Sequence, residues 1–196
     1  FLGNGFDRVI DEKDYTEVKF KGTWGVSDED LFDCAHQEFE QMGAQPFFAL
    51  VFTSSYHSPF EIPAGRLAAE FSNESPEHQA IRYADHALGY FFRQARQAAY
   101  WQRTLFLVVA DHDDRVRGAD LVPIRHFHIP GLIIGPGIPS AVYRDVASQI
   151  DLPPTLLGDG VVAYIGNTGY GWGLNHGIGY GERLVQLLTD ELTGGG

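Results

Sequence analysis

An aspartate and a histidine, Asp111 and His112, directly follow an apolar run at residues 104–110. A carboxylate and an imidazole are ligands for Mn²⁺, Zn²⁺ or Mg²⁺, and the histidine favours the first two. Neighbouring residues of an extended strand point to opposite faces, so both can reach one metal only where the chain leaves the sheet. The end of a strand provides that bend. The alternative is that Asp111 caps a turn and that His112 is an ordinary loop histidine.

His57 is a second candidate, because it lies in a polar loop after another apolar run, residues 47–52. It could hydrogen-bond an anionic group or carry a proton. The alternative is a solvated surface histidine. The remaining histidines are interpreted as packing, backbone-bonded or surface residues: His36, His78, His86, His126, His128 and His176.

Other kinds of site find little support in the sequence. Thr53, Ser54 and Ser55 offer hydroxyls, but no G-x-S-x-G elbow surrounds them. The glycine-rich segment 166–173 lacks the G-x-G-x-x-G spacing of a dinucleotide site. Cys34 is the only cysteine, which excludes an intrachain disulfide and a multi-thiolate metal site.

The composition limits the partners. The chain has 196 residues, 44% of them hydrophobic, and a net charge of −12. Such a surface repels nucleic acid and acidic membranes, so an anionic substrate would need a local cation, which a metal ion could supply. The sequence has no run of about 18 apolar residues, the length that spans a bilayer. We therefore expect no nucleic-acid partner and no membrane-spanning segment in this chain.

The elements that must position these residues alternate between strands and helices. Ser27 followed by carboxylates predicts a helix ending at Gly43, and Ser75-Pro76 begins a second helix with an apolar stripe. Four apolar runs predict strands at residues 47–52, 104–110, 129–135 and 161–165, the first two buried on both faces. Short helical turns at 145–150 and 154–157 and a last helix at 182–192 complete the pattern.

This alternation predicts an α/β fold with a mostly parallel sheet flanked by helices. Ligands of such folds bind beyond the carboxyl ends of the strands. That position is where the sequence places His57, Asp111 and His112.

Six segments together resemble motifs of sulfatase-like enzymes, in the branch of lipoteichoic acid synthases and membrane phosphoglycerol transferases. The segments and their motifs are 24–29 (W-G-x-x-D), 47–60 (N-H-x-P-F), 80–92 (R-Y-x-D-x-x-L-x-x-F-F), 104–112 (T-x-x-x-x-x-x-D-H-G), 128–137 (H-I-P-x-L-I-x-G-P-G) and 148–158 (S-Q-I-D-I-x-P-T-L-L-G). Asp113 stands where the family usually has glycine.

The resemblance covers residues 1–158 and implies the carboxyl-terminal, incomplete portion of an alkaline-phosphatase-like domain. It implies that Asp111 and His112 bind a divalent metal, Mn²⁺ or Zn²⁺ rather than Mg²⁺ or Ca²⁺, and that His57 contacts substrate phosphate. His128 matches its motif without an assigned role. The implied location is the extracytoplasmic side of a bacterial membrane.

The expected function is transfer or hydrolysis of a phosphate ester such as phosphoglycerol. The alternatives are hydrolysis of a sulfate ester and a non-catalytic, degenerate or fused module. In the family, the nucleophile and the first metal-binding carboxylate lie upstream of the matched segment. We therefore identify no catalytic nucleophile here, expect the chain alone to be inactive, and expect an upstream segment to complete the site.

Residues 159–196 form a separate strand–loop–helix tail in this interpretation. Its segment 161–173 resembles part of gingipain-type cysteine peptidases, where a strand also precedes G-N-x-x-Y-G-W. The peptidase motifs around the catalytic cysteine and histidine are missing, and Cys34 lies far upstream. The combination suggests a fragment, a fusion or an artificial chain.

Overall fold

A computed structural model of the chain describes residues 2–112, 127–144, 147–152 and 161–166. The principal helices are α1 (Asp28–Gln41) and α2 (Pro76–Ala95). The strands are β1 (Lys21–Gly22), β2 (Gly25–Val26), β3 (Phe48–Phe52), β4 (Thr104–Val109), β5 (Gly131–Ile134) and β6 (Val161–Gly166). Short 3-10 helices occupy Leu2–Asn4, Glu12–Asp14, Ala69–Phe71, Ala99–Arg103 and Gln149–Asp151. The predicted elements at 154–157 and 182–192 lie outside the described residues, as does the loop 167–173.

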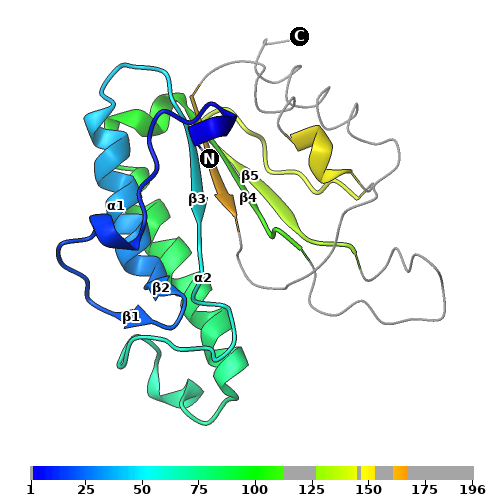
Figure 1. The fold of residues 1–196 in the computed structure, drawn as a ribbon. Coiled ribbons are helices and arrows are strands. Elements are labelled where there is room, and N and C mark those ends of the chain that lie inside the picture. Colours follow the sequence, from blue (N-terminus) through cyan, green and yellow to red (C-terminus); the bar gives the residue numbers. More distant parts are fainter. Residues whose placement is uncertain (1, 113–126, 145–146, 153–160, 167–196) are drawn as a thin grey trace.

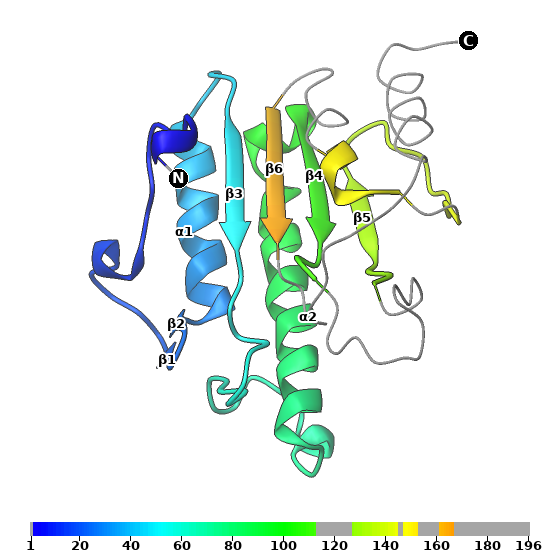
Figure 2. The same cartoon turned by 45° about the vertical axis from the view of Figure 1, so that its right-hand side comes forward.

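The main sheet has four strands in the order β3-β6-β4-β5 (Figure 2). β3, β6 and β4 are parallel, and β5 pairs antiparallel with β4. The mostly parallel sheet predicted from the sequence is therefore confirmed. β1 and β2 form a separate two-stranded hairpin near the start of α1 (Figure 1).

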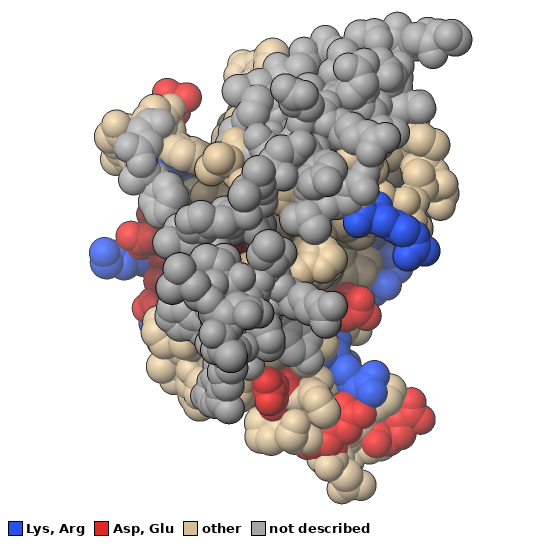
Figure 3. Space-filling view, turned by 90° about the vertical axis from the view of Figure 1, so that its right-hand side faces the viewer, with Lys and Arg blue, Asp and Glu red and all other residues tan. Residues whose placement is uncertain are grey.

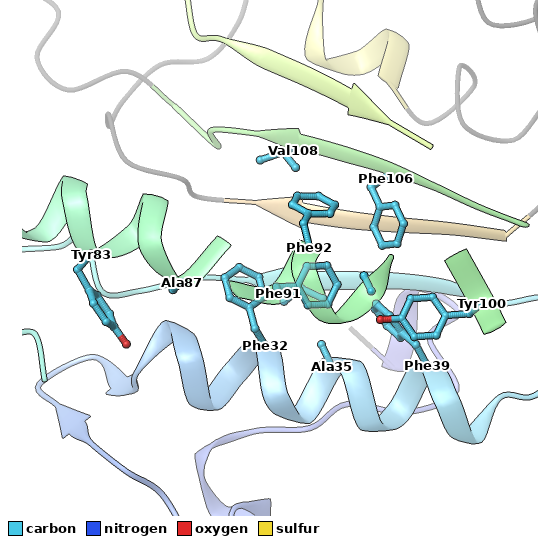
Figure 4. Close-up of a cluster of buried hydrophobic side chains, with 12 residues drawn as sticks. Phe32, Ala35, Phe39, Tyr83, Ala87, Phe91, Phe92, Tyr100, Phe106 and Val108 are labelled. Carbon is cyan, nitrogen blue, oxygen red and sulfur yellow. The ribbon is translucent and has the colours of Figure 1, made fainter. Parts of the chain in front are cut away.

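Both helices lie on one face of the sheet, and aromatic side chains fill the space between them (Figure 4). Phe91 of α2 is fully buried, with its ring centroid 5.1 Å from that of Phe32 on α1 and 5.9 Å from that of Phe106 on β4. Leu107 and Val109 pack on the opposite face of β4. β4 is thus buried on both faces, as its apolar sequence predicts.

β3 differs from the expectation that it is buried on both faces. In the described sheet it is an edge strand, and Phe48 and Phe52 at its two ends are about half exposed. Val51 is its only fully buried residue. An apolar run has the same appearance in a central strand and in an edge strand, so the sequence alone did not distinguish them.

The start of each helix follows its sequence signals. Ser27 caps α1, because its side chain accepts a hydrogen bond from the backbone N–H of Asp30, and Ser75 caps α2 through His78. Helical periodicity predicts a buried stripe of α2 that includes Ile81 and Leu88, but both are only half buried. Its buried residues are Ala80, Tyr83, Ala84, Ala87, Phe91, Phe92 and Ala95.

Candidate functional site

Asp111 and His112 lie directly beyond β4, and both are half buried. Asp111 Oδ2 lies 3.2 Å from His112 Nε2, and the backbone N–H of His112 donates to Asp111 Oδ1 at 2.9 Å. The two side chains therefore converge where the chain leaves the sheet. Two atoms bound to one metal at 2.0–2.2 Å lie about 3 Å apart, so this spacing fits a shared ion.

Gln149 holds the end of β4 in place. Its side-chain amide donates to the backbone carbonyls of Ala110 at 2.9 Å and Asp111 at 2.8 Å. Both carbonyls lie beyond the last residue of β4, Val109, and the amide satisfies them where the chain bends. Gln149 belongs to the S-Q-I-D segment of the family resemblance, but its contact with the end of β4 has no signal in the sequence.

The His57 loop follows β3 and is exposed at the histidine itself. The His57 ring lies 3.9 Å from the ring of Trp24, centroid to centroid, with the planes tilted by 45°. His57 Nδ1 lies 2.9 Å from the carbonyl oxygen of Ser58, which also accepts from Trp24 Nε1–H at 2.7 Å. Both rings border a small pocket whose lining also includes Ser55 and Glu61.

The two candidate regions lie at the same edge of the sheet. Phe52 of β3 is in register with Gly166 of β6, and Gly166 is in register with Val109 of β4. The parallel arrows of these strands point the same way in Figure 2. Because β6 separates β3 from β4, the two strand ends are about 10 Å apart. The loop with His57 and the turn with Asp111 thus emerge at one end of the sheet.

The described residues do not by themselves form a complete metal site. Among the residues that the structure describes, no three His, Cys, Asp or Glu side chains are grouped so that they could hold a metal ion. His128 is exposed, and His126 and His176 lie outside the described ranges. Asp111 and His112 remain a pair that could supply two of the ligands.

Three consecutive carboxylates at the start of α1, Asp28, Glu29 and Asp30, are buried, contrary to the solvated helix start that their types suggest. Acidic residues in a first helical turn are favourable on a solvated surface, so their types gave no signal of burial. Each one binds a different segment. Asp28 accepts from the Ser54 and Ser55 backbone N–H groups.

The other two carboxylates anchor segments on either side. Glu29 accepts from the Tyr83 hydroxyl of α2 at 3.2 Å and pairs with Arg66 at 2.9 Å. Asp30 accepts from the backbone N–H groups of Lys19 and Phe20, just before β1. The first turn of α1 thus connects the hairpin, α2 and the His57 loop.

Burial raises the pKa of several groups in this part of the molecule, including Asp28 and Cys34. Desolvation raises the pKa of Asp28 above its usual range, although the hydrogen bonds from Ser55 and Ser54 oppose the shift. Desolvation also raises the pKa of the Cys34 thiol. A raised pKa lowers the fraction of thiolate at neutral pH, and the thiolate is the nucleophilic form of cysteine.

On the face shown in Figure 3, Lys and Arg side chains lie on the right-hand side, at the left edge and near the bottom, and Asp and Glu side chains lie close to them. No helix in the described part of the chain has the length and apolar character needed to cross a membrane.

Comparison with known proteins identifies the family. A sequence model of the Sulfatase family matches residues 1–158. The chain belongs to the Sulfatase family. A solved structure from Vibrio parahaemolyticus, described as a protein in the alkaline phosphatase superfamily, is 53% identical and has a TM-score of 0.74. That match covers 80% of this chain and 39% of the other, and it confirms the predicted alkaline-phosphatase-like fold.

Two curated relatives of this Sulfatase family chain come from Bacillus subtilis and Xanthomonas campestris. Lipoteichoic acid synthase-like YvgJ of Bacillus subtilis is 25% identical over 179 residues, covering 78% of this chain and 28% of that protein. Phosphoglycerol transferase I of Xanthomonas campestris is 27% identical over 170 residues, covering 79% of this chain and 24% of that protein. The chain spans about a quarter of the length of these relatives.

Proposed function

We propose that this chain supplies the metal-binding and phosphate-contacting part of an enzyme that transfers or hydrolyses a phosphate ester, with phosphoglycerol as the favoured group. The observation that carries the proposal is the convergence of Asp111 Oδ2 and His112 Nε2, 3.2 Å apart, at the carboxyl end of β4. Similarity to a protein named phosphoglycerol transferase I supports this choice of substrate.

Asp111 and His112 would hold the metal, and the family generally uses a divalent ion. An imidazole beside a carboxylate favours Mn²⁺ or Zn²⁺ over Mg²⁺ or Ca²⁺. When bound, such an ion would polarise the phosphoryl group and lower the pKa of an attacking hydroxyl. Gln149 would keep both ligands at the bend by fixing the carbonyls of Ala110 and Asp111.

His57 would contact the phosphate from the end of β3, which lies two strands from β4 at the same edge of the sheet. In the neutral ring, donation from Nδ1 to the Ser58 carbonyl places the lone pair on Nε2. Protonation of Nε2 would turn it into a charged donor to an anionic oxygen. An extracytoplasmic position at a bacterial membrane and an upstream segment that completes the site belong to the same proposal.

Two alternatives are kept beside this proposal. The matched family is named Sulfatase, which favours a sulfate ester as the second candidate substrate. The other alternative is a non-catalytic, degenerate or fused module, in which Asp111 and His112 hold no ion.

Metal titration tests the proposal directly. We expect Zn²⁺ and Mn²⁺ to raise the Tm of the chain more than Mg²⁺ or Ca²⁺ does, because an ion that binds the folded state stabilises it. Asp111→Ala and His112→Ala should each abolish this rise. His78→Ala, at an exposed histidine of α2, is the matched control and should leave it unchanged. An equal metal response in His112→Ala would contradict the proposal and favour the non-catalytic module.

The two ester classes are separated by a binding experiment on the metal-loaded chain. We expect glycerol 1-phosphate to move the NMR signals of the His57 ring at lower concentration than a sulfate monoester of the same alcohol. The reverse order would assign the site to sulfate esters.

A further inference from the structure

Asp28 of α1 binds the loop that follows β3. Asp28 is 1% exposed, and its Oδ1 accepts from the Ser54 N–H at 3.1 Å and the Ser55 N–H at 3.0 Å. The backbone N–H of Asp28 donates in return to Ser55 Oγ at 3.1 Å. This reciprocal contact fixes the backbone two to three residues before His57.

Trp24 contacts the same loop through its indole N–H and its ring. Its Nε1–H and His57 Nδ1 meet at one acceptor, the Ser58 carbonyl, at 2.7 Å and 2.9 Å. The ring contact at 3.9 Å restricts rotation of the imidazole about its side-chain bonds. A solvated histidine has neither restraint, so this arrangement selects both the orientation and the tautomer of His57.

The conformation of the loop requires such support. Phe60 has a φ of +63°, a left-handed conformation that a bulky side chain rarely adopts. Its backbone N–H donates to the His57 carbonyl at 2.6 Å, which closes the turn around the histidine. A disfavoured conformation persists only where the surrounding structure determines it, and such conformations gather at functional sites.

The burial of the Asp28 carboxylate is not explained by a gain in folding stability. Its Oδ2 is buried without a hydrogen-bond partner among the described residues. A half-satisfied buried carboxylate opposes folding, even at a helix start where the dipole favours negative charge. The compensating feature is the pair of N–H groups that its other oxygen holds.

We propose that Asp28 and Trp24 are positioning residues for His57. Asp28 sets the backbone of the loop, and Trp24 sets the ring plane and fixes the Ser58 carbonyl that accepts from Nδ1, so that Nε2 faces a ligand at the sheet edge. The importance of this arrangement for phosphate binding rests on the proposed function. The arrangement itself does not.

The first test uses Trp24, because it is 55% exposed and its removal leaves the core intact. Imidazole ¹⁵N shifts of the folded chain at pH 8 report the His57 tautomer. We expect the Nδ1–H form in the wild type and a shift toward the Nε2–H form in Trp24→Ala. Trp24→Phe, which keeps a ring but loses the donor, should be intermediate. The exposed ring of His78 is the internal control. An unchanged His57 tautomer in Trp24→Ala would overturn the proposal.

The second test uses amide hydrogen exchange at Ser54 and Ser55. Asp28→Ala should speed exchange of both amides at least tenfold, while Asp28→Asn, whose side-chain oxygen still accepts, should stay within about threefold of the wild type. Glu29→Gln alters a neighbouring buried carboxylate that contacts Tyr83 instead, and should leave both amides unchanged. Slow exchange in a folded Asp28→Ala would contradict the proposal. If that variant does not fold, rapid exchange in Asp28→Asn would contradict it.

A final measurement connects the arrangement to binding. Glycerol 1-phosphate is titrated into the wild type and Trp24→Ala while His57 ring signals are followed. We expect at least fivefold weaker binding in Trp24→Ala; equal affinity would overturn positioning for binding. If the wild type shows no response, the proposed role of His57 in phosphate contact fails, whereas the tautomer and exchange results still decide whether Trp24 and Asp28 position the ring.

Discussion

The two strand ends that carry candidate site residues are stabilised in different ways. Beyond β4, Asp111 and His112 continue a strand with five of its six residues buried, and a single amide from Gln149 fixes the bend. Beyond β3, an edge strand, the loop with His57 is held by side chains that lie 26 to 34 positions earlier in the chain.

This difference explains which residues can be recognised from sequence. The residues that directly follow a buried strand lie at the edge of the sheet. Residues adjacent in sequence, such as Asp111 and His112, are therefore also adjacent in the site. A loop held from outside depends on residues such as Asp28 and Trp24, whose contribution appears only when distant segments are brought together. The four predictions below test this contrast between the two ends.

The largest expected effect comes from the core beneath β4. Phe106→Ala should lower the free energy of unfolding by about 3–5 kcal/mol, because Phe106 is fully buried against Phe91, Phe92 and Trp101. Urea denaturation followed by circular dichroism measures the loss. Phe52→Ala, at the half-exposed end of β3, is the matched control and should cost less than about 1 kcal/mol. Equal losses would show that β3 is as firmly packed as β4.

A pH-dependent effect is expected at the loop after β3. Burial raises the pKa of Asp28, so folding opposes its ionisation. The penalty is absent below the unfolded pKa of about 3.9 and grows as the pH rises toward the folded pKa. The stability of Asp28→Asn minus that of the wild type should therefore increase as pH rises from about 4, by roughly 1–3 kcal/mol. A difference that is constant with pH would contradict the buried, partly unsatisfied state of this carboxylate.

A smaller effect is expected at the end of β4. Gln149→Ala removes two hydrogen bonds to strand-end carbonyls and should cost about 1 kcal/mol. It should also weaken Zn²⁺ binding up to about tenfold, since the backbone of Asp111 loses its support. Calorimetric titration measures the affinity, with the exposed Gln37→Ala as control. Unchanged affinity would mean that the strand alone positions the pair.

The smallest effect is expected at His128. This histidine matches the family motif but is exposed, so His128→Ala should change stability by less than about 0.5 kcal/mol. The metal-dependent rise in Tm should also remain. Loss of that rise would add His128 to the ligands and bring the segment before β5 into the site.

Much of the fold follows from local sequence signals. The cap at Ser27, the proline after Ser75 and the apolar run of β4 each determine an element through short-range physics, and the structure confirms all three. The exposure of β3 was not predictable, because strand order in the sheet is set by long-range pairing. The division of the chain at residue 158 and the roles of His57, Asp111 and His112 stay predictions.

The buried carboxylates mark the limit of sequence reasoning most clearly. Asp28 and its two neighbours have the composition of an ordinary helix start, and nothing local distinguishes a solvated carboxylate from one that binds a distant backbone. Tyr83 is similar, because its burial on α2 depends on Glu29 of α1 as a partner for its hydroxyl. Such residues are recognised through their partners.

The first turn of α1 also sets where the chain tolerates a change of length. One residue inserted there would rotate the following side chains by roughly 100° about the helix axis. The hairpin, α2 and the loop after β3 would then lose their anchors together. The connection at residues 43–46, between α1 and β3, is exposed and anchors none of these three segments. It is therefore the better place for an inserted tag or for dividing the chain.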